Sequence, residues 1–381
     1  MRDEPSANPA PLRVVIIDDQ AAIRQALRTL LQGEPDIQVV AEAQDGEEGL
    51  KVVHTEQPDA VLLDLEMPRL DGFAFLRLQM AKKPVPVVVV SSHATRESVF
   101  RALELGAMEF VAKPLRIAGS ADLGPIREDL LRKLRLVRFL SMQSLSDRMS
   151  AQRRGGPVRS RSSEDLLSSL RVGGGQSLVP KALICIGAST GGPPAILSIL
   201  QSLHTQLPVS VLVTQHMPEK FTAAFVERLR RTTAWPVREA DAELPVAPGE
   251  VVVASASYSL CVYRDGPLLR LLPPSIDERR SKGYVPSIDR MMEAAAQAMG
   301  PQVIAVLLTG MSGDGIDGIL AVRRAGGRVL AEEPSSAVVA SMPEEAIRSG
   351  AVHEIAPLRR IPDVLTRWVL APPPVRGTPT K

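Results

Sequence analysis

The chain has 381 residues, of which 45% are hydrophobic, and this is enough apolar material for more than one core, so two domains are expected. The formal net charge of +2 lacks the basic excess of a nucleic-acid-binding protein, and no nucleic-acid partner is expected. Apolar runs stay well short of the roughly 18 residues that span a bilayer. The start at residues 1–5 is not a signal peptide, so neither membrane insertion nor secretion is expected.

The two cysteines, Cys185 and Cys261, lie in apolar runs, and we expect them in the core rather than in a disulfide or a metal site. This usage fits a reducing, cytoplasmic location. The polar, proline-containing ends at residues 1–11 and 371–381 are expected to be disordered.

Residues 12–112 alternate between apolar runs typical of buried parallel strands and segments with helical periodicity. The predicted strands are 12–17, 37–43, 60–63, 85–90 and 110–112, and the predicted helices are 22–31, 47–56, 73–80 and 96–105. Strands that alternate with helices in this way predict an α/β domain with a doubly wound, five-stranded parallel sheet.

Polar side chains follow four of these strands. Asp18 and Asp19 follow the first, Asp64 the third, Ser91 the fourth and Lys113 the fifth. They should converge, because ligands of such sheets bind where the strands end. Three carboxylates suit Mg²⁺, and a lysine can pair with an added phosphoryl group. A solvated strand end is the simpler interpretation of Lys113 alone, but five such residues together make it improbable.

These residues lie in motifs that resemble, in order and spacing over residues 12–118, those of response-regulator receiver domains. The matching segments are Ile17–Asp19, Asp64–Pro68 with Asp71-Gly72, Val90–Ser92 and Phe110–Pro114. The likeness implies a flavodoxin-like fold. Phe110 stands where many members have tyrosine, so an aromatic switch would work here without a hydroxyl.

The same likeness implies roles for the residues at the strand ends. Asp64 would accept a phosphoryl group from a histidine kinase. Mg²⁺ would be held by Asp18, Asp19 and Asp64, with help from the backbone carbonyl of Glu66. By the same likeness Ser91 would follow the phosphoryl group and Lys113 would be its ion partner.

Helical spacing continues from 123 to 145, and the stretch 147–176 is rich in Ser, Arg and Gly. Such a stretch buries little and is expected to be a flexible linker. We therefore place the receiver at residues 12–122, a helix and linker at 123–180, and the second domain at 181–370.

The second domain begins with an apolar run, 182–186, that leads into the segment Ile186–Pro193, which predicts a strand, a sharp turn and a helix. Glycines allow the reversal, and Pro193-Pro194 suits a first helical turn. Ser189 stands at the bend, where its hydroxyl is expected to point outward beside free backbone N–H groups. A serine nucleophile needs this exposure, and the donors would hold the oxyanion.

Three interpretations of this turn compete: the Gly-x-Ser-x-Gly elbow of α/β-hydrolases, a glycine-rich phosphate loop and a plain strand–helix turn. A dinucleotide loop requires a carboxylate at the end of the next strand. That strand, 209–214, ends instead in Gln215-His216, which offers a potential base. This weakens the alternative of a nucleotide-binding oxidoreductase.

Further along, a helix is expected at 221–230, an antiparallel insert at 237–272 with a hairpin turn at Asp265-Gly266, and a helix at 288–299. The strand 303–308 ends in a glycine-rich turn that contains Asp314. Three strand ends thus offer Ser189, His216 and Asp314 as nucleophile, base and orienting carboxylate. Taken singly, His216 would more often be a structural strand end and Asp314 a helix cap.

The two domains together resemble the chemotaxis response-regulator methylesterases, the protein-glutamate methylesterase/protein-glutamine glutaminase (CheB) family. The matching segments are Ile186–Gly192, Thr214–Pro218 with Phe221-Thr222, Leu308–Met311 with Gly313–Gly315, and Met342-Pro343 with Ala346-Ile347. The likeness implies a cytoplasmic, phosphorylation-activated hydrolase. Its substrates would be methyl esters on glutamates of chemoreceptors, together with selected glutamines.

By that likeness Ser189, His216 and Asp314 form the triad, with Thr190 and the backbone N–H of Met311 at the oxyanion, and no cofactor is expected in this domain. Two departures lie near the expected substrate wall and bear on receptor preference. They are Val285, where relatives commonly have arginine, and Ser255, where proline is usual. The alternative from another class is a phosphorylation-controlled binding module that has lost its chemistry.

Overall fold

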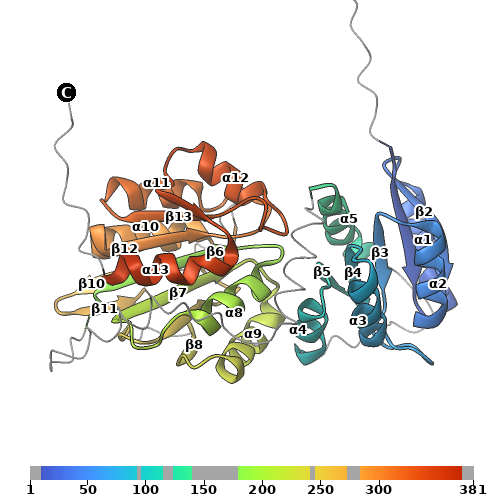
Figure 1. Cartoon of the computed structure of the whole chain (residues 1–381), viewed down its shortest axis with the longest axis horizontal. Helices are drawn as coiled ribbons and strands as arrows, with labels where there is room; N and C mark the ends of the chain where they lie inside the picture. Colours follow the sequence, from blue (N-terminus) through green and yellow to red (C-terminus); the bar gives the residue numbers. More distant parts are fainter. Residues whose placement is uncertain are drawn as a thin grey trace, which may run out of the picture. The chain divides into compact units, whose positions relative to one another are not determined.

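The computed structural model describes residues 10–91, 96–114, 123–139, 179–240, 245–272 and 284–370. The expected linker and nearly all of both expected tails lie outside these ranges. The chain divides into two compact units, residues 1–149 and 150–381 (Figure 1). Within the described ranges, every helix is too short or too polar to cross a bilayer.

The first unit is built on a five-stranded parallel sheet with the order β2-β1-β3-β4-β5. Its strands are β1 Leu12–Ile17, β2 Ile37–Ala43, β3 Ala60–Leu63, β4 Val87–Ser91 and β5 Glu109–Ala112. Its first four helices are α1 Ala21–Gln32, α2 Gly46–Glu56, α3 Gly72–Lys82 and α4 Arg96–Glu104. The expected sheet is confirmed, and the central strands β3 and β4 are buried along their whole length because helices cover both faces of the sheet.

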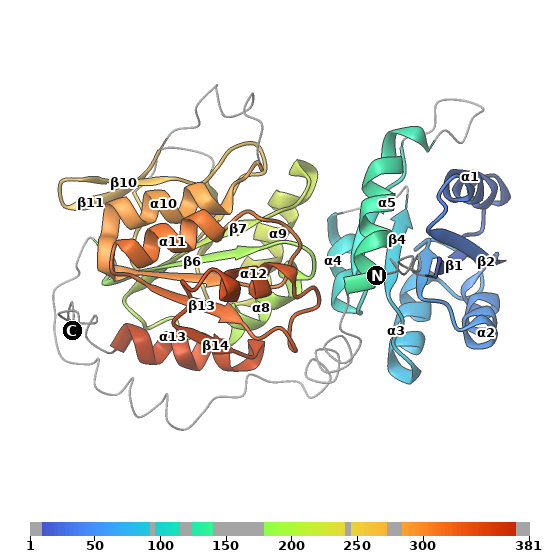
Figure 2. The same ribbon diagram turned by 90° about the horizontal axis from the view of Figure 1, so that it is seen from above.

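The helical segment expected to lead into the linker instead packs on this sheet. It comprises η1 Gly124–Ile126, α5 Arg127–Arg135 and η2 Leu136–Phe139. Leu130 and Leu134 are fully buried, and Lys133 Nζ donates to the carbonyl oxygen of Phe110 in β5 at 2.6 Å. Arg135 pairs with Asp36 after α1 through bonds of 2.8 and 2.9 Å. Helix α1 lies on the opposite side of β1 and β2 from α2 (Figure 2). The unit therefore continues past the boundary expected at residue 122.

The second unit is built on a seven-stranded sheet with the order β14-β13-β12-β6-β7-β9-β8, in which every pair is parallel. Its strands are β6 Ala182–Ala188, β7 Val209–Gln215, β8 Val237–Ala240, β9 Val251–Ala254, β12 Val303–Leu307, β13 Arg328–Glu332 and β14 Glu354–Ala356. Its helices are α8 Gly192–Ser202, α9 Glu219–Thr232, α10 Ile288–Met299, η5 Gly300–Gln302, α11 Ile316–Arg324, α12 Ser341–Arg348, η6 Leu358–Arg360 and α13 Ile361–Leu370.

The antiparallel insert expected over residues 237–272 is smaller than predicted. Strands β8 and β9 join the main sheet in parallel, since β9 pairs with β7 and β8 with β9. All four residues of β9 are buried, as in a central parallel strand covered on both faces. Among the described residues of this region, β10 Val262–Asp265 and β11 Leu268–Leu271 form an antiparallel hairpin, whose turn contains Gly266 as expected.

Two helical layers enclose the seven-stranded sheet. Helices α10, α11 and α12 cover one face, and α8, α9 and α13 cover the other (Figure 1). The core under α10 includes Met291, Met292 and residues of the β10–β11 hairpin. Cys185 and Cys261 are free and buried, as expected.

In each unit, one central strand lies where the strand order reverses. In the first unit β1 lies between β2 and β3, and in the second β6 lies between β12 and β7. The crevice of such a sheet opens at the carboxyl ends of the strands beside this position. In the first unit, the segments that follow β1 and β3 are therefore neighbours. In the second unit, the segments that follow β6, β7 and β12 are neighbours in the same way.

Gly72, at the start of α3, lies where there is no room for a side chain. A Cβ built there would be 2.3 Å from the carbonyl oxygen of Asp64, whereas at Gly33 the nearest atom would be 4.0 Å away. We expect Gly72→Ala to lower the free energy of unfolding of the first unit by about 1–3 kcal/mol, and Gly33→Ala to leave it nearly unchanged.

The two tryptophans allow this to be measured, because Trp235 and Trp368 both belong to the second unit. Denaturation of Gly72→Ala should show an earlier far-UV circular dichroism transition with an unchanged tryptophan fluorescence transition. Equal circular dichroism transitions for Gly72→Ala and Gly33→Ala would contradict the close approach to Asp64.

Candidate functional site

At the edge of the first sheet, two of the predicted carboxylates lie against the predicted lysine. Lys113 Nζ lies 2.6 Å from Asp18 Oδ2 and 2.7 Å from Asp64 Oδ2, and all three side chains are buried. The remaining oxygens of the two carboxylates accept backbone N–H groups, from Gln20 at 2.8 Å and from Leu65 at 2.7 Å. The polar residues that follow β1, β3 and β5 therefore meet at this edge, as expected.

Asp19 completes a carboxylate cluster. Oxygens of Asp18, Asp19 and Asp64 lie within 4.8 Å of one another. Burial raises the pKa of Asp18 even though Lys113 lies beside it, so one ammonium group does not fully offset this negative charge. A set of hard oxygen donors with uncompensated charge fits a divalent cation.

Two other predicted residues lie at the same edge. Ser91 ends β4 and is buried, and its carbonyl oxygen accepts the backbone N–H of Lys113 at 3.0 Å. Glu66 is exposed two residues after Asp64. The metal role of its backbone carbonyl stays a prediction.

In the second unit, backbone hydrogen bonds continue beyond the ends of β6, β7 and β12. The N–H of Ser189 donates to the carbonyl of Thr309 at 3.1 Å, and the N–H of His216 donates to the carbonyl of Ala188 at 3.1 Å. These bonds join the turns that carry the three proposed catalytic residues. The order of the strands thus fixes the backbone spacing of the site.

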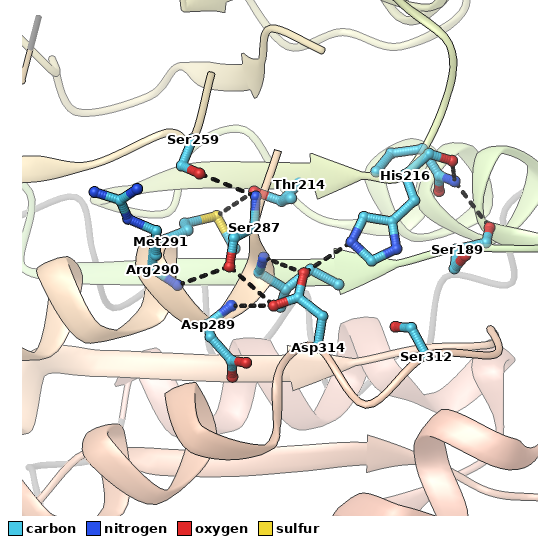
Figure 3. Close-up of polar contacts among 12 residues, drawn as sticks. Ser189, Thr214, His216, Ser259, Ser287, Asp289, Arg290, Met291, Ser312 and Asp314 are labelled. Atoms are coloured by element: carbon cyan, nitrogen blue, oxygen red, sulfur yellow. Dashed lines mark hydrogen bonds and ion pairs between the residues drawn. The ribbon is translucent and has the colours of Figure 1, made fainter. Parts of the chain in front are cut away.

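His216 and Asp314 are in direct contact, with His216 Nε2 2.8 Å from Asp314 Oδ2 (Figure 3). A carboxylate only accepts, so Nε2 carries the proton and Nδ1 is left as the basic nitrogen. Burial alone would raise the pKa of Asp314, but hydrogen bonds from His216 and from the backbone N–H groups of Asp289 and Ile288 outweigh it and lower this pKa. Asp314 is therefore ionised at neutral pH.

Ser189 lies beside His216 (Figure 3), but the residue is buried, with 8% of its surface exposed, whereas an outward-pointing hydroxyl was expected. No hydrogen bond found among the described residues joins the Ser189 hydroxyl to the imidazole. Catalytic hydrogen bonds often form only when substrate is bound. Gly191 caps α8 with φ of +77°, which few other residues adopt, and this bends the chain just after the nucleophile position.

Gln215 holds the nucleophile and base segments at a fixed spacing. Its Nε2 donates to the carbonyl of Ser189 at 2.8 Å and to the carbonyl of His216 at 3.0 Å. The side chain is buried against Gly192, where a Cβ would lie 1.9 Å from Gln215 Oε1. This role was missed in the sequence, where Gln215 was read only as the end of a strand.

Thr309 joins the turn of Ser189 to the loop of Met311. Its hydroxyl donates to the carbonyl of Thr190 at 2.9 Å and accepts the N–H of Val339 at 2.9 Å, while its N–H donates to the buried Glu332 at 2.9 Å. The next residue, Gly310, packs on Ser189, since a Cβ there would lie 2.7 Å from Ser189 Cβ. The oxyanion roles of Thr190 and Met311 stay predictions.

Two further residues at this site were not predicted from the sequence. The ring of Tyr284 stacks on that of His216 with centroids 5.0 Å apart and an angle of 7° between the planes. Ser287 donates a hydrogen bond to Asp314. Ser287 could have been recognised as a helix N-cap, because serine is favoured directly before a helical segment. The sequence carries no such signal for the stacking of Tyr284.

Models of known protein families match both units. The CheB methylesterase family model matches residues 184–365, and the response regulator receiver domain model matches residues 14–119. The crystal structure of the Thermotoga maritima CheB methylesterase catalytic domain is 32% identical, covers 49% of this chain and 97% of that one, and has a TM-score of 0.45.

Curated relatives match along almost the whole chain. Protein-glutamate methylesterase/protein-glutamine glutaminase 3 of Geobacter sulfurreducens is 42% identical over 92% of this chain and 95% of the relative. Protein-glutamate methylesterase/protein-glutamine glutaminase 6 of Anaeromyxobacter dehalogenans is 45% identical over 90% of this chain and 92% of the relative. With a receiver domain followed by a methylesterase domain, the chain belongs to the protein-glutamate methylesterase/protein-glutamine glutaminase family.

Proposed function

We propose that the second unit hydrolyses γ-glutamyl methyl esters of chemoreceptors and deamidates selected glutamines, with Ser189 as nucleophile, His216 as base and Asp314 as its orienting carboxylate. The observation that carries this proposal is the contact of His216 Nε2 with Asp314 beside Ser189. It leaves the basic Nδ1 for the proton of the serine hydroxyl.

In the first half of the reaction, Ser189 Oγ attacks the ester carbonyl carbon while its proton passes to His216 Nδ1. Backbone N–H groups of Thr190 and Met311 would stabilise the oxyanion. The C–O bond to the methoxy group then breaks, and methanol leaves with the proton from His216. Asp314 stabilises the imidazolium that exists between these two transfers.

In the second half, water attacks the acyl group on Ser189. His216 accepts a proton from this water and returns it to Ser189 Oγ as the acyl–oxygen bond breaks. The product is a free glutamate side chain. With a glutamine substrate, the first leaving group is ammonia and the later steps are the same.

The competing interpretations of the Ser189 turn fit the site less well. A dinucleotide-binding loop needs a carboxylate after β7 to bond a ribose, and this position holds Gln215 and His216. A module without chemistry would have no need of a buried, ionised Asp314 aimed at His216, an arrangement that is costly to maintain without a function.

Replacement of the nucleophile tests the proposal. Ser189→Ala should lower methanol release from methylated receptor membranes on the order of 10³-fold or more, because the attacking atom is removed. A matched control is Ser210→Ala, which removes the hydroxyl of another buried serine, one in β7 whose hydroxyl donates to the carbonyl of Ala247. The control should retain turnover, and near-normal methanol release from Ser189→Ala would rule out the assigned nucleophile.

For the first unit, we propose that Asp64 accepts a phosphoryl group from a histidine kinase in the cytoplasm, and that this raises hydrolase activity. Mg²⁺ would be held by the carboxylates of Asp18, Asp19 and Asp64 and the backbone carbonyl of Glu66. When bound, the ion would neutralise these carboxylates and the oxygens of the incoming phosphoryl group. Buried at the same edge, Ser91 and Lys113 would follow the phosphoryl group after transfer.

Removal of the lysine tests the charge balance of this metal site. Lys113→Ala leaves Asp18 and Asp64 without their cation and should lower the free energy of unfolding of the first unit by about 3–5 kcal/mol. Added Mg²⁺ should stabilise this variant more than the wild type, because Lys113 no longer competes for the carboxylates. The far-UV circular dichroism transition with and without Mg²⁺ measures both effects.

The control for this experiment is Lys51→Ala, at an exposed position of α2. It should behave as the wild type with and without Mg²⁺. A Lys113→Ala transition that does not respond to Mg²⁺ would contradict a metal site at these carboxylates.

Phosphorylation is tested on the intact chain. Mg²⁺ with a small acyl phosphate should raise methanol release severalfold in the wild type and not in Asp64→Asn, because only Asp64 can form the acyl phosphate that draws in Ser91 and Lys113. Asp129→Asn, a change of the same kind in α5, should still respond. If Asp64 becomes phosphorylated and the rate stays constant, the receiver does not activate the hydrolase and a docking role is favoured.

A further inference from the structure

The carboxylate of Asp314 is held by four donors (Figure 3). Oδ2 accepts from His216 Nε2 at 2.8 Å and from the backbone N–H of Ile288 at 2.7 Å. Oδ1 accepts from the Ser287 hydroxyl at 2.9 Å and from the backbone N–H of Asp289 at 3.0 Å. Three of the four donors therefore come from the start of α10, and only one comes from the proposed base.

Ser287 is itself fixed in orientation. It is the N-cap of α10, where its Oγ accepts the backbone N–H of Arg290 at 3.3 Å, and its own N–H donates to Ser259 Oγ at 3.1 Å. A hydroxyl has one proton, and since its oxygen already accepts from Arg290, that proton is directed to Asp314. An aspartate would cap the helix equally well but would place a second negative charge against Asp314.

We propose that Ser287 is a positioning residue of the hydrolase, whose hydroxyl holds Asp314 Oδ1 so that Oδ2 stays aligned with His216 Nε2. This inference rests on the proposed triad and assigns to it a fourth side chain, one that does not touch the substrate. Two contacts on each carboxylate oxygen fix the plane of the carboxylate, and loss of the hydroxyl leaves Oδ1 with a single contact.

Other charged or titratable groups face this pair. Asp289 lies next to Asp314, and burial together with the charge of Asp314 raises the pKa of Asp289 to about 7, although its Oδ1 accepts the N–H of Gly318 at 2.7 Å. Tyr284 stacks on His216 from the segment before α10. The guanidinium of Arg290 points away from Asp314 (Figure 3). Donors on Asp314 are therefore the main local compensation for its charge.

The test compares Ser287→Ala with Ser287→Thr. In Ser287→Ala we expect the plateau kcat for methanol release to fall about tenfold with little change in KM, because the carboxylate plane is no longer fixed. With one donor fewer, Asp314 should also hold the protonated imidazole of His216 more strongly, so the acidic limb of the pH–rate profile should move up by about 0.5 pH unit. Threonine keeps a hydroxyl and should restore both values.

A second readout does not depend on turnover. The chain has only five histidines, so the NMR titration of His216 can be assigned with a His216→Gln sample. Its midpoint should move upward in Ser287→Ala and stay at the wild-type value in Ser287→Thr. Ser210→Ala, the matched buried serine in β7, should lose some thermal stability while leaving the titration and the pH–rate profile unchanged.

The outcomes separate this inference from the proposed function. The positioning role would be overturned if Ser287→Ala kept the titration midpoint and the pH–rate profile of the wild type. It would also be overturned if Ser210→Ala shifted both by the same amount as Ser287→Ala. Ser287 would then be a structural cap only. If the titration midpoint of His216 moves upward in Ser287→Ala but the wild type releases no methanol, the contact of Ser287 with Asp314 is supported and the methylesterase proposal is contradicted.

Discussion

Negative charge at the carboxyl edge of a covered parallel sheet is the constraint that organises both units. Helices cover both faces of each sheet, so water cannot solvate these carboxylates freely, and burying an unpaired charge costs several kcal/mol. In the first unit the charges of Asp18 and Asp64 are offset in part by the ammonium group of Lys113. In the second, Asp314 is offset by N–H groups of α10, by a hydroxyl and by an imidazole.

The two solutions suit different kinds of chemistry. An ammonium group on a flexible stem can move, so the carboxylates it pairs with can later accept a metal or a phosphoryl group. Backbone N–H groups at the start of a helix cannot move without disturbing the helix, so Asp314 keeps one orientation toward His216. The edge of the first sheet can therefore accommodate a change of charge, whereas the edge of the second keeps the carboxylate of Asp314 in one orientation.

Much of this architecture could be predicted because parallel strands covered on both faces are continuous apolar runs, and the residues that follow them must meet. The meeting of His216 with Asp314 beside Ser189 was predicted in this way, as was that of Asp18 and Asp64 with Lys113. The parallel direction of β8 and β9 was missed because a short apolar run does not indicate which strand it pairs with or in which direction. The packing of α5 was missed because an amphipathic helix looks the same on a sheet and in a linker.

Ser287 was missed for a different reason. Its partner Asp314 is 27 residues away, and only the fold brings them within hydrogen-bonding distance. The burial of Ser189 was also not predictable from a small-residue turn, because it depends on the packing of Gly310 and Gln215 around that turn.

The stacking of Tyr284 on His216 has a consequence for the order of chemical events. The parallel ring of Tyr284 covers one face of the imidazole and Nε2 is bonded to Asp314, so Nδ1 is the nitrogen left to exchange protons with reactants. In the proposed mechanism, departing methanol and attacking water must use that same edge in turn. In that mechanism the two half-reactions would not overlap, and the kinetics would be of the ping-pong type, with the alcohol released before water enters.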